Sequence, residues 1–168
     1  FDNDGLSDLW TEVYEAHNLS ADADTDGDGY SNRFESEIGS DPFDPKSYFG
    51  LNSYRFESNN TLLILNLQVV KGMRYFIESA RELGPQAIWR PETVINSNEN
   101  GPLVLEQFID RSTDSTRFFR VRQVIDEDRD GLTSWEEWQL GLDDRDPLSN
   151  GGESSDFHWA VDRHLVGL

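Results

Sequence analysis

Residues 24–47 read DTDGDGYSNRFESEIGSDPFDPKS, and residues 126–149 read DEDRDGLTSWEEWQLGLDDRDPLS. The two stretches align without a gap, so that every residue of the first has its counterpart at one constant offset in the second. The residues they share include three aspartates at alternate positions, the glycine that follows them, a later glutamate and an Asp-Pro pair. A solvated acidic run has no reason to keep such spacing twice, so we predict that the two stretches are copies of one structural unit.

Each copy opens with the twelve-residue pattern D-x-D-x-D-G-x-x-(N/S)-x-x-E, which has the spacing of a calcium-binding loop. Carboxylates two residues apart in a tight loop repel one another, and a divalent cation between them makes the arrangement favourable. Calcium takes about six to eight oxygen ligands, and Gly29 and Gly131 allow the sharp turn that such a loop needs. The predicted ligands, with a backbone carbonyl from Tyr30 and Leu132, are Asp24, Asp26, Asp28, Tyr30, Asn32 and Glu35 in the first loop and Asp126, Asp128, Asp130, Leu132, Ser134 and Glu137 in the second.

A shortened form of the same pattern opens the chain, where Asp2 and Asp4 take the third and fifth loop positions. The first position would precede Phe1, and Thr11 stands where the closing glutamate belongs. Two interpretations stay open: a partial calcium site completed from outside this stretch, or loop acids beside a helix start. Two calcium sites are therefore predicted and a third is left open, and the interrupted motif suggests that the chain is a piece of a longer protein.

Five further aspartates lie close to the two loops and leave a choice of roles. They could add calcium ligands, or they could serve the turns that precede and follow each short helix, which is the interpretation we favour for the Asp-Pro segments. These residues are Asp22, Asp41, Asp44, Asp143 and Asp146.

The segment between the copies has the pattern of short strands. Apolar runs occur around Leu62 and Ile64, at 75–79, at 103–108 and at 117–122, with turn residues between them. This pattern predicts a mainly β fold, a small antiparallel sandwich of six or seven strands flanked by calcium loop–helix segments at both ends. Helices are expected at 7–18, 31–38 and 133–140, the last opened by a capping box of Thr133 and Glu136.

Four segments are expected along the chain. Residues 1–47 form the N-terminal calcium-binding segment, 48–124 the sandwich, 125–150 the C-terminal loop and helix, and 151–168 a linker or tail. The glycines and serines at 151–155 favour a linker, whereas the apolar residues after them leave open an amphipathic helix with Phe157, Val161, His164 and Leu165 on one face.

The composition narrows the classes of function. The chain has 168 residues, 33 acids, 14 lysines and arginines, a formal net charge of −19 and no cysteine. Such a charge repels nucleic acid and anionic membrane surfaces, and the absence of cysteine excludes disulfides and thiol catalysis. No apolar run is long enough to insert into a membrane, and no catalytic motif occurs, so we predict no enzyme activity.

The loop followed by one helix resembles the half EF-hand of dockerins and of thrombospondin type 3 repeats. The longer phrases DNDGLSDLW, DTDGDGYSNRFE and GSDPFDP resemble calcium repeats of secreted multidomain bacterial proteins, which flank β-sandwich modules. The segments GMRYFIESA and RFFRVRQ resemble the small sandwich carried beside those repeats. The copies are much farther apart here than the two loops of a dockerin, and the cysteines of a thrombospondin array are missing.

The resemblance implies a secreted, non-catalytic structural or adhesive module at the cell surface. In such a module calcium stiffens the fold and its junctions with adjacent modules or subunits, including those of a filament. The alternative is a carbohydrate-binding accessory module of a polysaccharide-degrading enzyme, with Trp89 or Tyr54 stacking on a sugar.

Overall fold

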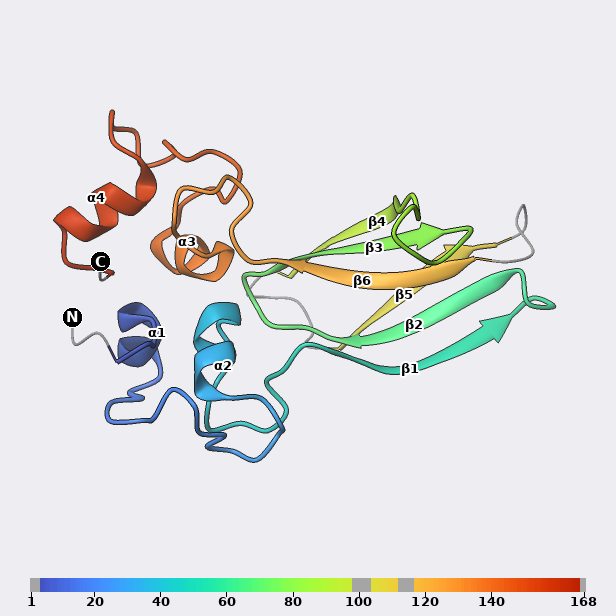
Figure 1. The fold of residues 1–168 in the computed structure, drawn as a ribbon, viewed down its shortest axis with the longest axis horizontal. Coiled ribbons are helices and arrows are strands. Elements are labelled where there is room, and N and C mark those ends of the chain that lie inside the picture. The colour runs from blue at the N-terminus through green and yellow to red at the C-terminus, as the bar shows by residue number, and fades with distance from the viewer. Residues whose placement is uncertain (1–3, 98–103, 112–116, 167–168) are drawn as a thin grey trace.

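In the part of the chain that the structure describes, strands form a sandwich at one end of the molecule and four short helices gather at the other (Figure 1). The computed structural model describes residues 4–97, 104–111 and 117–166. Both chain termini lie at the helical end (Figure 1). The elements in chain order are α1 (Asp8–Val13), α2 (Asn32–Ile38), β1 (Gly50–Glu57), β2 (Leu62–Gln68), β3 (Arg74–Ala80), β4 (Arg90–Asn96), β5 (Val104–Asp110), β6 (Phe118–Val124), α3 (Ser134–Leu140) and α4 (Asp156–Asp162).

The strands form two antiparallel three-stranded sheets with the orders β1-β2-β5 and β4-β3-β6. The predicted mainly β fold with a small antiparallel sandwich is therefore confirmed. The two central strands β2 and β3 carry most of the buried side chains, whereas β1 is exposed along nearly its whole length. This difference follows from position, because a central strand has a neighbour on both sides and an edge strand has one.

Alternate residues of the central strands fill the space between the sheets. Leu63, Leu65 and Leu67 of β2 and Tyr75 and Ile77 of β3 are all buried in one cluster. They occur at every second position because successive side chains of a strand point to opposite faces of its sheet.

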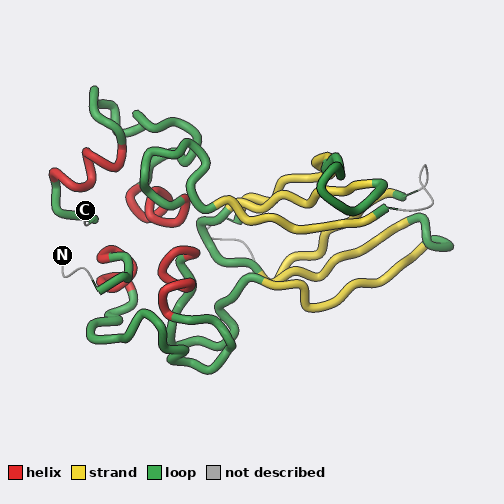
Figure 2. The backbone as a smooth tube through the Cα atoms, viewed as in Figure 1, coloured by secondary structure: helices red, strands yellow, loops and turns green. Residues whose placement is uncertain are grey.

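The helical end shares this core and is not a separate appendage. Trp10 of α1, Ile38 of α2 and Trp135 of α3 belong to the same buried cluster as Leu67 and Tyr75. The tube view shows the helices grouped beside one end of the two sheets (Figure 2). Burying the apolar faces of the calcium-loop helices against the sandwich links the two ends of the molecule energetically.

The predicted helices are present with one change of length. Helices α2 and α3 lie within one residue of the predicted 31–38 and 133–140, and the capping box of Thr133 and Glu136 is confirmed. The helix predicted over 7–18 ends at Val13. The carbonyl of Thr11 accepts the amide of Ala16 (2.9 Å), and Glu15 has a φ of 53°, which turns the chain. Ala16, which follows the turn, is buried.

The C-terminal segment forms part of the helix that the sequence left open: α4 ends at Asp162, so Phe157 and Val161 lie on it, whereas His164, with a φ of 56°, and Leu165 follow its end. Helix α4 follows the loop of residues 151–155, with Ser155 as its N-cap. Ala160 of this helix packs with Leu132 and Val166 in a second, smaller core beside the second repeat.

Candidate metal centres in the two repeats

The first loop is held by its own aspartate side chains. Asp24 accepts the amides of Gly27 (2.8 Å) and Gly29 (3.0 Å) through its two carboxylate oxygens. Asp26 accepts the amide of Asp28 (3.1 Å) through Oδ1, and Asp28 accepts the amide of Tyr30 (2.8 Å) in the same way. Each carboxylate is thus fixed by the backbone that follows it.

The second loop repeats these contacts at the equivalent positions. Asp126 accepts the amides of Arg129 (2.6 Å) and Gly131 (3.3 Å). The Oδ1 atoms of Asp128 and Asp130 accept the amides two residues onward, at 3.1 and 2.9 Å. The sequence repeat therefore corresponds to a repeat of hydrogen-bond geometry.

The three aspartates of each loop converge. One carboxylate oxygen from each of Asp24, Asp26 and Asp28 lies within 4.8 Å of the others, and Asp126, Asp128 and Asp130 do the same. Like charges this close repel one another, and their attraction to a divalent cation coordinated between them would outweigh that repulsion.

The last ligand position of each loop lies on a helix whose ends are capped. Ser31 and Thr133 cap the starts of α2 and α3, and Gly39 and Gly141 end them in the left-handed conformation. These short helices carry Glu35 and Glu137, both fully buried, back toward the loops. The backbone closes each loop through the amide of the ninth residue, which donates to the residue preceding the first aspartate.

Several buried oxygens at the predicted ligand positions have no hydrogen-bond donor within the described part of the chain. In the first repeat they are Asp26 Oδ2, Asp28 Oδ2, Asn32 Oδ1 and Glu35 Oε2, and in the second Asp128 Oδ2 and both carboxylate oxygens of Glu137. Buried polar atoms are normally paired, so a concentration of unpaired acceptors calls for a partner of another kind. A cation that prefers hard oxygen ligands would fit this set of unpaired oxygens.

The electrostatics of the protein groups alone point the same way. Burial, together with the nearby carboxylate of Asp128, raises the pKa of Glu137 to about 9. Burial raises the pKa of Glu35 to about 7, although a hydrogen bond from Ser40 opposes the shift. Asp128 is raised to a pKa of about 6 by burial, and the pKa of Asp26 is raised for the same reason. Ionised carboxylates are unfavourable here without a compensating positive charge.

The ninth positions differ between the repeats. Asn32 donates its amide group to the carbonyl of Ser20 (2.8 Å), which leaves its Oδ1 unpaired and buried. Ser134 donates its hydroxyl to the carbonyl of Val124 (3.5 Å). The roles of these residues and of the Tyr30 and Leu132 carbonyls as ligands stay predictions.

The neighbouring aspartates make turn and surface contacts. Asp22 is exposed and forms an ion pair with Arg33 at 3.3 Å. The other four each accept the amide two residues onward, which is the turn role that we favoured: Asp41, Asp44, Asp143 and Asp146.

The opening half-loop keeps one feature of the complete loops. Asp4 Oδ1 accepts the amide of Leu6 at 2.9 Å, as the fifth-position aspartates do in both repeats. Asp2 lies outside the described residues. A third site therefore stays a prediction.

The two repeats contact each other directly. A Cβ atom on Gly39 would lie 2.0 Å from the indole ring of Trp135, so the end of α2 rests against α3. Tyr14 stacks on the same indole (5.9 Å between centroids) and donates its hydroxyl to the carbonyl of Gly39 (2.8 Å). Ser7, at the start of α1, donates to Glu136 (2.6 Å).

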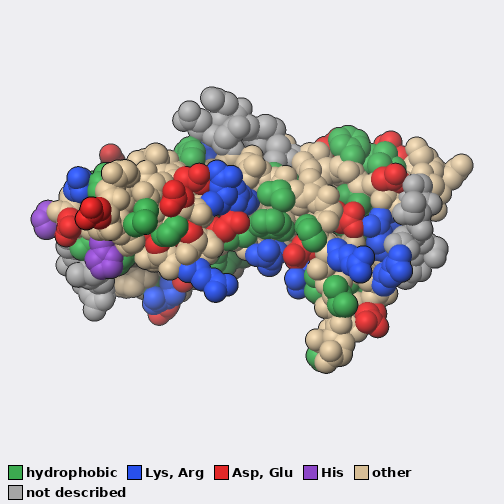
Figure 3. All heavy atoms as spheres, turned by 90° about the horizontal axis from the view of Figure 1, so that it is seen from above, with side chains coloured by type: hydrophobic (Ala, Val, Ile, Leu, Met, Phe, Trp, Pro, Cys, Tyr) green, Lys and Arg blue, Asp and Glu red, His purple; other side chains and the backbone are tan. Residues whose placement is uncertain are grey.

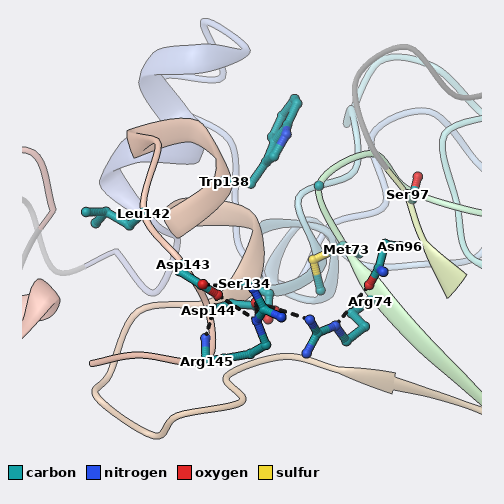
Figure 4. A pocket seen from close by; sticks show the side chains of 11 residues that line it. Met73, Arg74, Asn96, Ser97, Ser134, Trp138, Leu142, Asp143, Asp144 and Arg145 are labelled. Atoms are coloured by element: carbon teal, nitrogen blue, oxygen red, sulfur yellow. Dashed lines mark hydrogen bonds and ion pairs between the residues drawn. The ribbon is translucent and has the colours of Figure 1, made fainter. Parts of the chain in front are cut away.

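The second repeat is also tied to the sandwich, through Arg74 at the start of β3. Arg74 pairs with Glu127 inside the loop and with Asp144 (3.8 Å), and it donates to Asn96 (3.0 Å). Figure 4 shows Arg74 extending between Asn96 and Asp144 at the edge of a hollow of about 350 Å³. Sequence reasoning missed this contact, whose only signal is that Glu127 and Asp144 replace Thr25 and Pro42 of the first copy.

The two residues proposed for sugar stacking lie apart in the fold. Trp89 precedes β4, and the guanidinium of Arg120 covers its ring at 4.3 Å. Tyr54 lies on β1 of the other sheet, is 64% exposed and meets Phe56 edge-on. Glycan binding through either residue stays a prediction.

Comparison with known proteins identifies one of the repeats. Residues 24–45 match the family model of the bacterial TSP3 repeat, which covers the first loop from Asp24, helix α2 and the Asp-Pro turn. No curated protein and no solved structure was found to match the chain. The thrombospondin type 3-like resemblance is thus confirmed at this repeat, whereas the dockerin and sandwich resemblances stay predictions.

TSP3 repeats are calcium-binding structural modules found in extracellular proteins. In the described part of the chain, no helix has the length and apolar character needed to cross a membrane.

Proposed function

We propose that the chain is a non-catalytic extracellular module in which two calcium ions stiffen the fold and its junctions with neighbouring modules. The observation that carries this proposal is the set of buried oxygens without hydrogen-bond donors in the described chain, which recur at predicted ligand positions of both repeats. A solvated acidic turn would expose these oxygens to water instead of burying them.

Calcium would act as a staple for this cysteine-free chain. An ion that binds the folded loops and not the unfolded chain adds its binding free energy to folding. Extracellular calcium modules often have dissociation constants of ~10⁻⁴–10⁻³ M. The protein would therefore be rigid in calcium-rich surroundings and looser where calcium is scarce.

The contacts around the loops explain how local binding would stiffen the whole module. Glu35 and Glu137 close the loops from helices that pack on each other through Gly39 and Trp135. Arg74 links the second repeat to the sandwich through its ion pair with Glu127. We propose that this stiffness serves a surface or filament protein, in which the module keeps a fixed orientation to adjacent modules or subunits.

Calorimetric titration of the chelator-treated chain with calcium tests the proposal. We expect two ions per chain, with one lost in Asp24→Ala and the other in Asp126→Ala. Asp22→Ala is the matched control, because Asp22 is exposed and pairs with Arg33 outside the loop. An absence of binding at millimolar calcium, or equal losses in the control, would contradict the proposal.

Calcium-dependent assembly needs a separate measurement. Size-exclusion chromatography coupled to light scattering, run once in calcium and once in EDTA, reports the mass of the protein in solution. We expect the mass to increase with calcium if the isolated module carries its own subunit contact. A mass unchanged by calcium would leave the staple intact and remove self-assembly of this module from the proposal.

A further inference from the structure

Helix α4 makes a direct contact with the second loop. The amide of Phe157 donates to Oδ2 of Asp130 at 2.8 Å, so this predicted ligand is held from both sides, by Leu132 within the loop and by α4 from outside it. The ring of Phe157 lies against the turn of the loop, where a Cβ atom on Gly131 would be 3.3 Å away from it.

The first loop has no such cover among the described residues. Oδ2 of Asp28, the counterpart of Asp130, has no hydrogen-bond donor in that part of the chain. A Cβ atom on Gly29, the counterpart of Gly131, would meet nothing within 4 Å. The two loops therefore share their internal geometry and differ in their surroundings.

Asp156 fixes the start of α4 to the second repeat. Its side chain is fully buried and accepts the amides of Ser149 (3.1 Å) and Asn150 (2.9 Å) together with both side chains of that pair. Burial opposes its ionisation, but these hydrogen bonds outweigh it and lower its pKa. Its negative charge acts on Asp128 and Glu137, which are both predicted calcium ligands.

The side of the loop that faces α4 is also part of an apolar core. Leu132, whose carbonyl is a predicted ligand, packs with Ala160 and Val166 and is 1% exposed. Its counterpart Tyr30 instead stacks on Phe34, inside the first repeat, at 5.0 Å. A change in the conformation of the second loop at Leu132 would therefore disturb the packing of α4.

We propose that residues 156–166 are an integral part of the second calcium site, which they complete by positioning Asp130 and by adding the negative charge of Asp156. Calcium binding at this loop and docking of α4 are then coupled, and the first site lacks this coupling. The inference rests on the proposed calcium binding, and it adds that the two sites differ in affinity and in what they control.

The physical basis is linkage between two equilibria. Groups around the direct ligands orient them, and losing such a group costs about 10–100-fold in metal affinity. A coupling free energy is reciprocal, so α4 must strengthen calcium binding by the factor by which calcium strengthens α4 docking. We therefore expect the second site to bind calcium about tenfold more tightly than the first.

Two single-site proteins separate the sites for calorimetry. Glu35→Gln keeps the second site, and Glu137→Gln keeps the first. Adding Asp156→Asn should weaken calcium binding about tenfold in the former and leave it within about twofold in the latter. Asp162→Asn, an exposed change on the same helix, is the control and should alter neither. Calcium binding that survives in both backgrounds with no effect of Asp156→Asn would overturn the coupling alone, whereas loss of binding in both would overturn the proposed function.

The hydrogen bond to Asp130 is tested by a matched pair of changes. Phe157→Ala removes the ring and keeps the amide donor, whereas Phe157→Pro removes both, at a first-turn position that tolerates proline. In the Glu35→Gln background we expect proline to weaken calcium binding several-fold more than alanine does. Equal effects would show that the donor plays no part.

Hydrogen exchange tests the reciprocal effect in proteins whose α4 is unaltered. Calcium should slow the exchange of the amides at 157–166 in the wild type and in Glu35→Gln, and should have no such effect in Glu137→Gln. If Glu137→Gln retains the calcium-dependent protection, the second site does not control α4 and the inference is wrong.

Discussion

Glu35 and Glu137 occupy the same position in the two repeats but have different partners. Ser40 donates its hydroxyl to Glu35 at 3.1 Å, whereas the corresponding residue of the second repeat is Leu142 and neither oxygen of Glu137 has a donor in the described chain. The pKa of Glu137 is accordingly the higher of the two, at about 9 against about 7. The second glutamate therefore depends more strongly on a cation.

Replacing Glu137 by glutamine should have opposite effects with and without calcium. In EDTA, Glu137→Gln removes a buried carboxylate that is costly to ionise, so its melting temperature should equal or exceed that of the wild type. In calcium, the variant should lose the stabilisation from its site. Thermal melts in both conditions measure this, with the exposed Glu37→Gln as control. A variant less stable than the wild type in EDTA would contradict this account.

Calcium should remove the pH dependence of stability that the calcium-free protein shows. In the calcium-free protein the folded-state pKa of Glu137, about 9, lies above the unfolded value of 4.5. The folded state then binds more protons between these values, so its stability falls as pH rises through this window. With calcium bound, the carboxylate is ionised both in the folded protein and, above its unfolded pKa of 4.5, in the unfolded chain, so stability should be nearly independent of pH in this window. Melting temperatures from pH 5.5 to 8.5 should therefore diverge, and parallel curves would contradict the assignment.

At the scale of elements, two glycines test how closely the repeats pack. Gly39 and Gly141 end α2 and α3 with φ of 76° and 74°. Alanine at either position incurs the left-handed penalty of about 1–2 kcal/mol. Only at Gly39 does the added Cβ also collide with Trp135, at 2.0 Å, for roughly another 1–3 kcal/mol of overpacking. In denaturant unfolding, Gly39→Ala should have a clearly lower free energy of unfolding than Gly141→Ala. Equal losses of unfolding free energy in the two variants would show that the repeats do not pack tightly.

We expect the ion pairs of Arg74 to stabilise the junction between the second repeat and the sandwich. Its side chain is 14% exposed and pairs with Glu127 and Asp144. Arg74→Met keeps the apolar stem and should cost about 1.5–3 kcal/mol, as for hydrogen bonds to charged groups. Arg55→Met is the control, because Arg55 pairs with Glu57 and Glu106 on an open surface and should have little effect. Equal losses of unfolding free energy in the two variants would contradict the role of Arg74.

Sequence patterns over a few residues correctly predicted those elements whose structure depends on residues close together in the chain. The loops, helices α2 and α3 and the Thr133 capping box follow from short-range spacing, and the structure contains them. Strands β1 and β4 have mostly exposed residues, so they lack the apolar runs that marked β2 and β3. The contacts of Arg74 with Glu127 and of Phe157 with Asp130 join residues far apart in the chain, so no short-range spacing pattern predicts which residues meet.

For the whole molecule, charge is divided unevenly between the two ends. Residues 48–124 contain nine of the 14 lysines and arginines and eight of the 33 acids, so all of the net negative charge lies in the repeats and tail. Figure 3 shows a blue group of basic side chains over the strand end. Self-repulsion at the helical end opposes folding, and calcium bound in the two loops, as proposed, would reduce it.

The core joins both ends, so the molecule should unfold as one unit. Trp10, Ile38 and Trp135 from the helical end share a cluster with Leu67 and Tyr75 of the sandwich. If calcium binds the loops as proposed, its loss should therefore lower the stability of the sandwich as well as that of the helices.

Scanning calorimetry of the whole chain in calcium and in EDTA tests the central claim most directly. At a calcium concentration about 100 times the dissociation constant, each site adds about 2.7 kcal/mol. Two sites should then raise the melting temperature by roughly 10–20 °C, in a single transition. A melting temperature unchanged by EDTA would contradict the claim that calcium staples this fold.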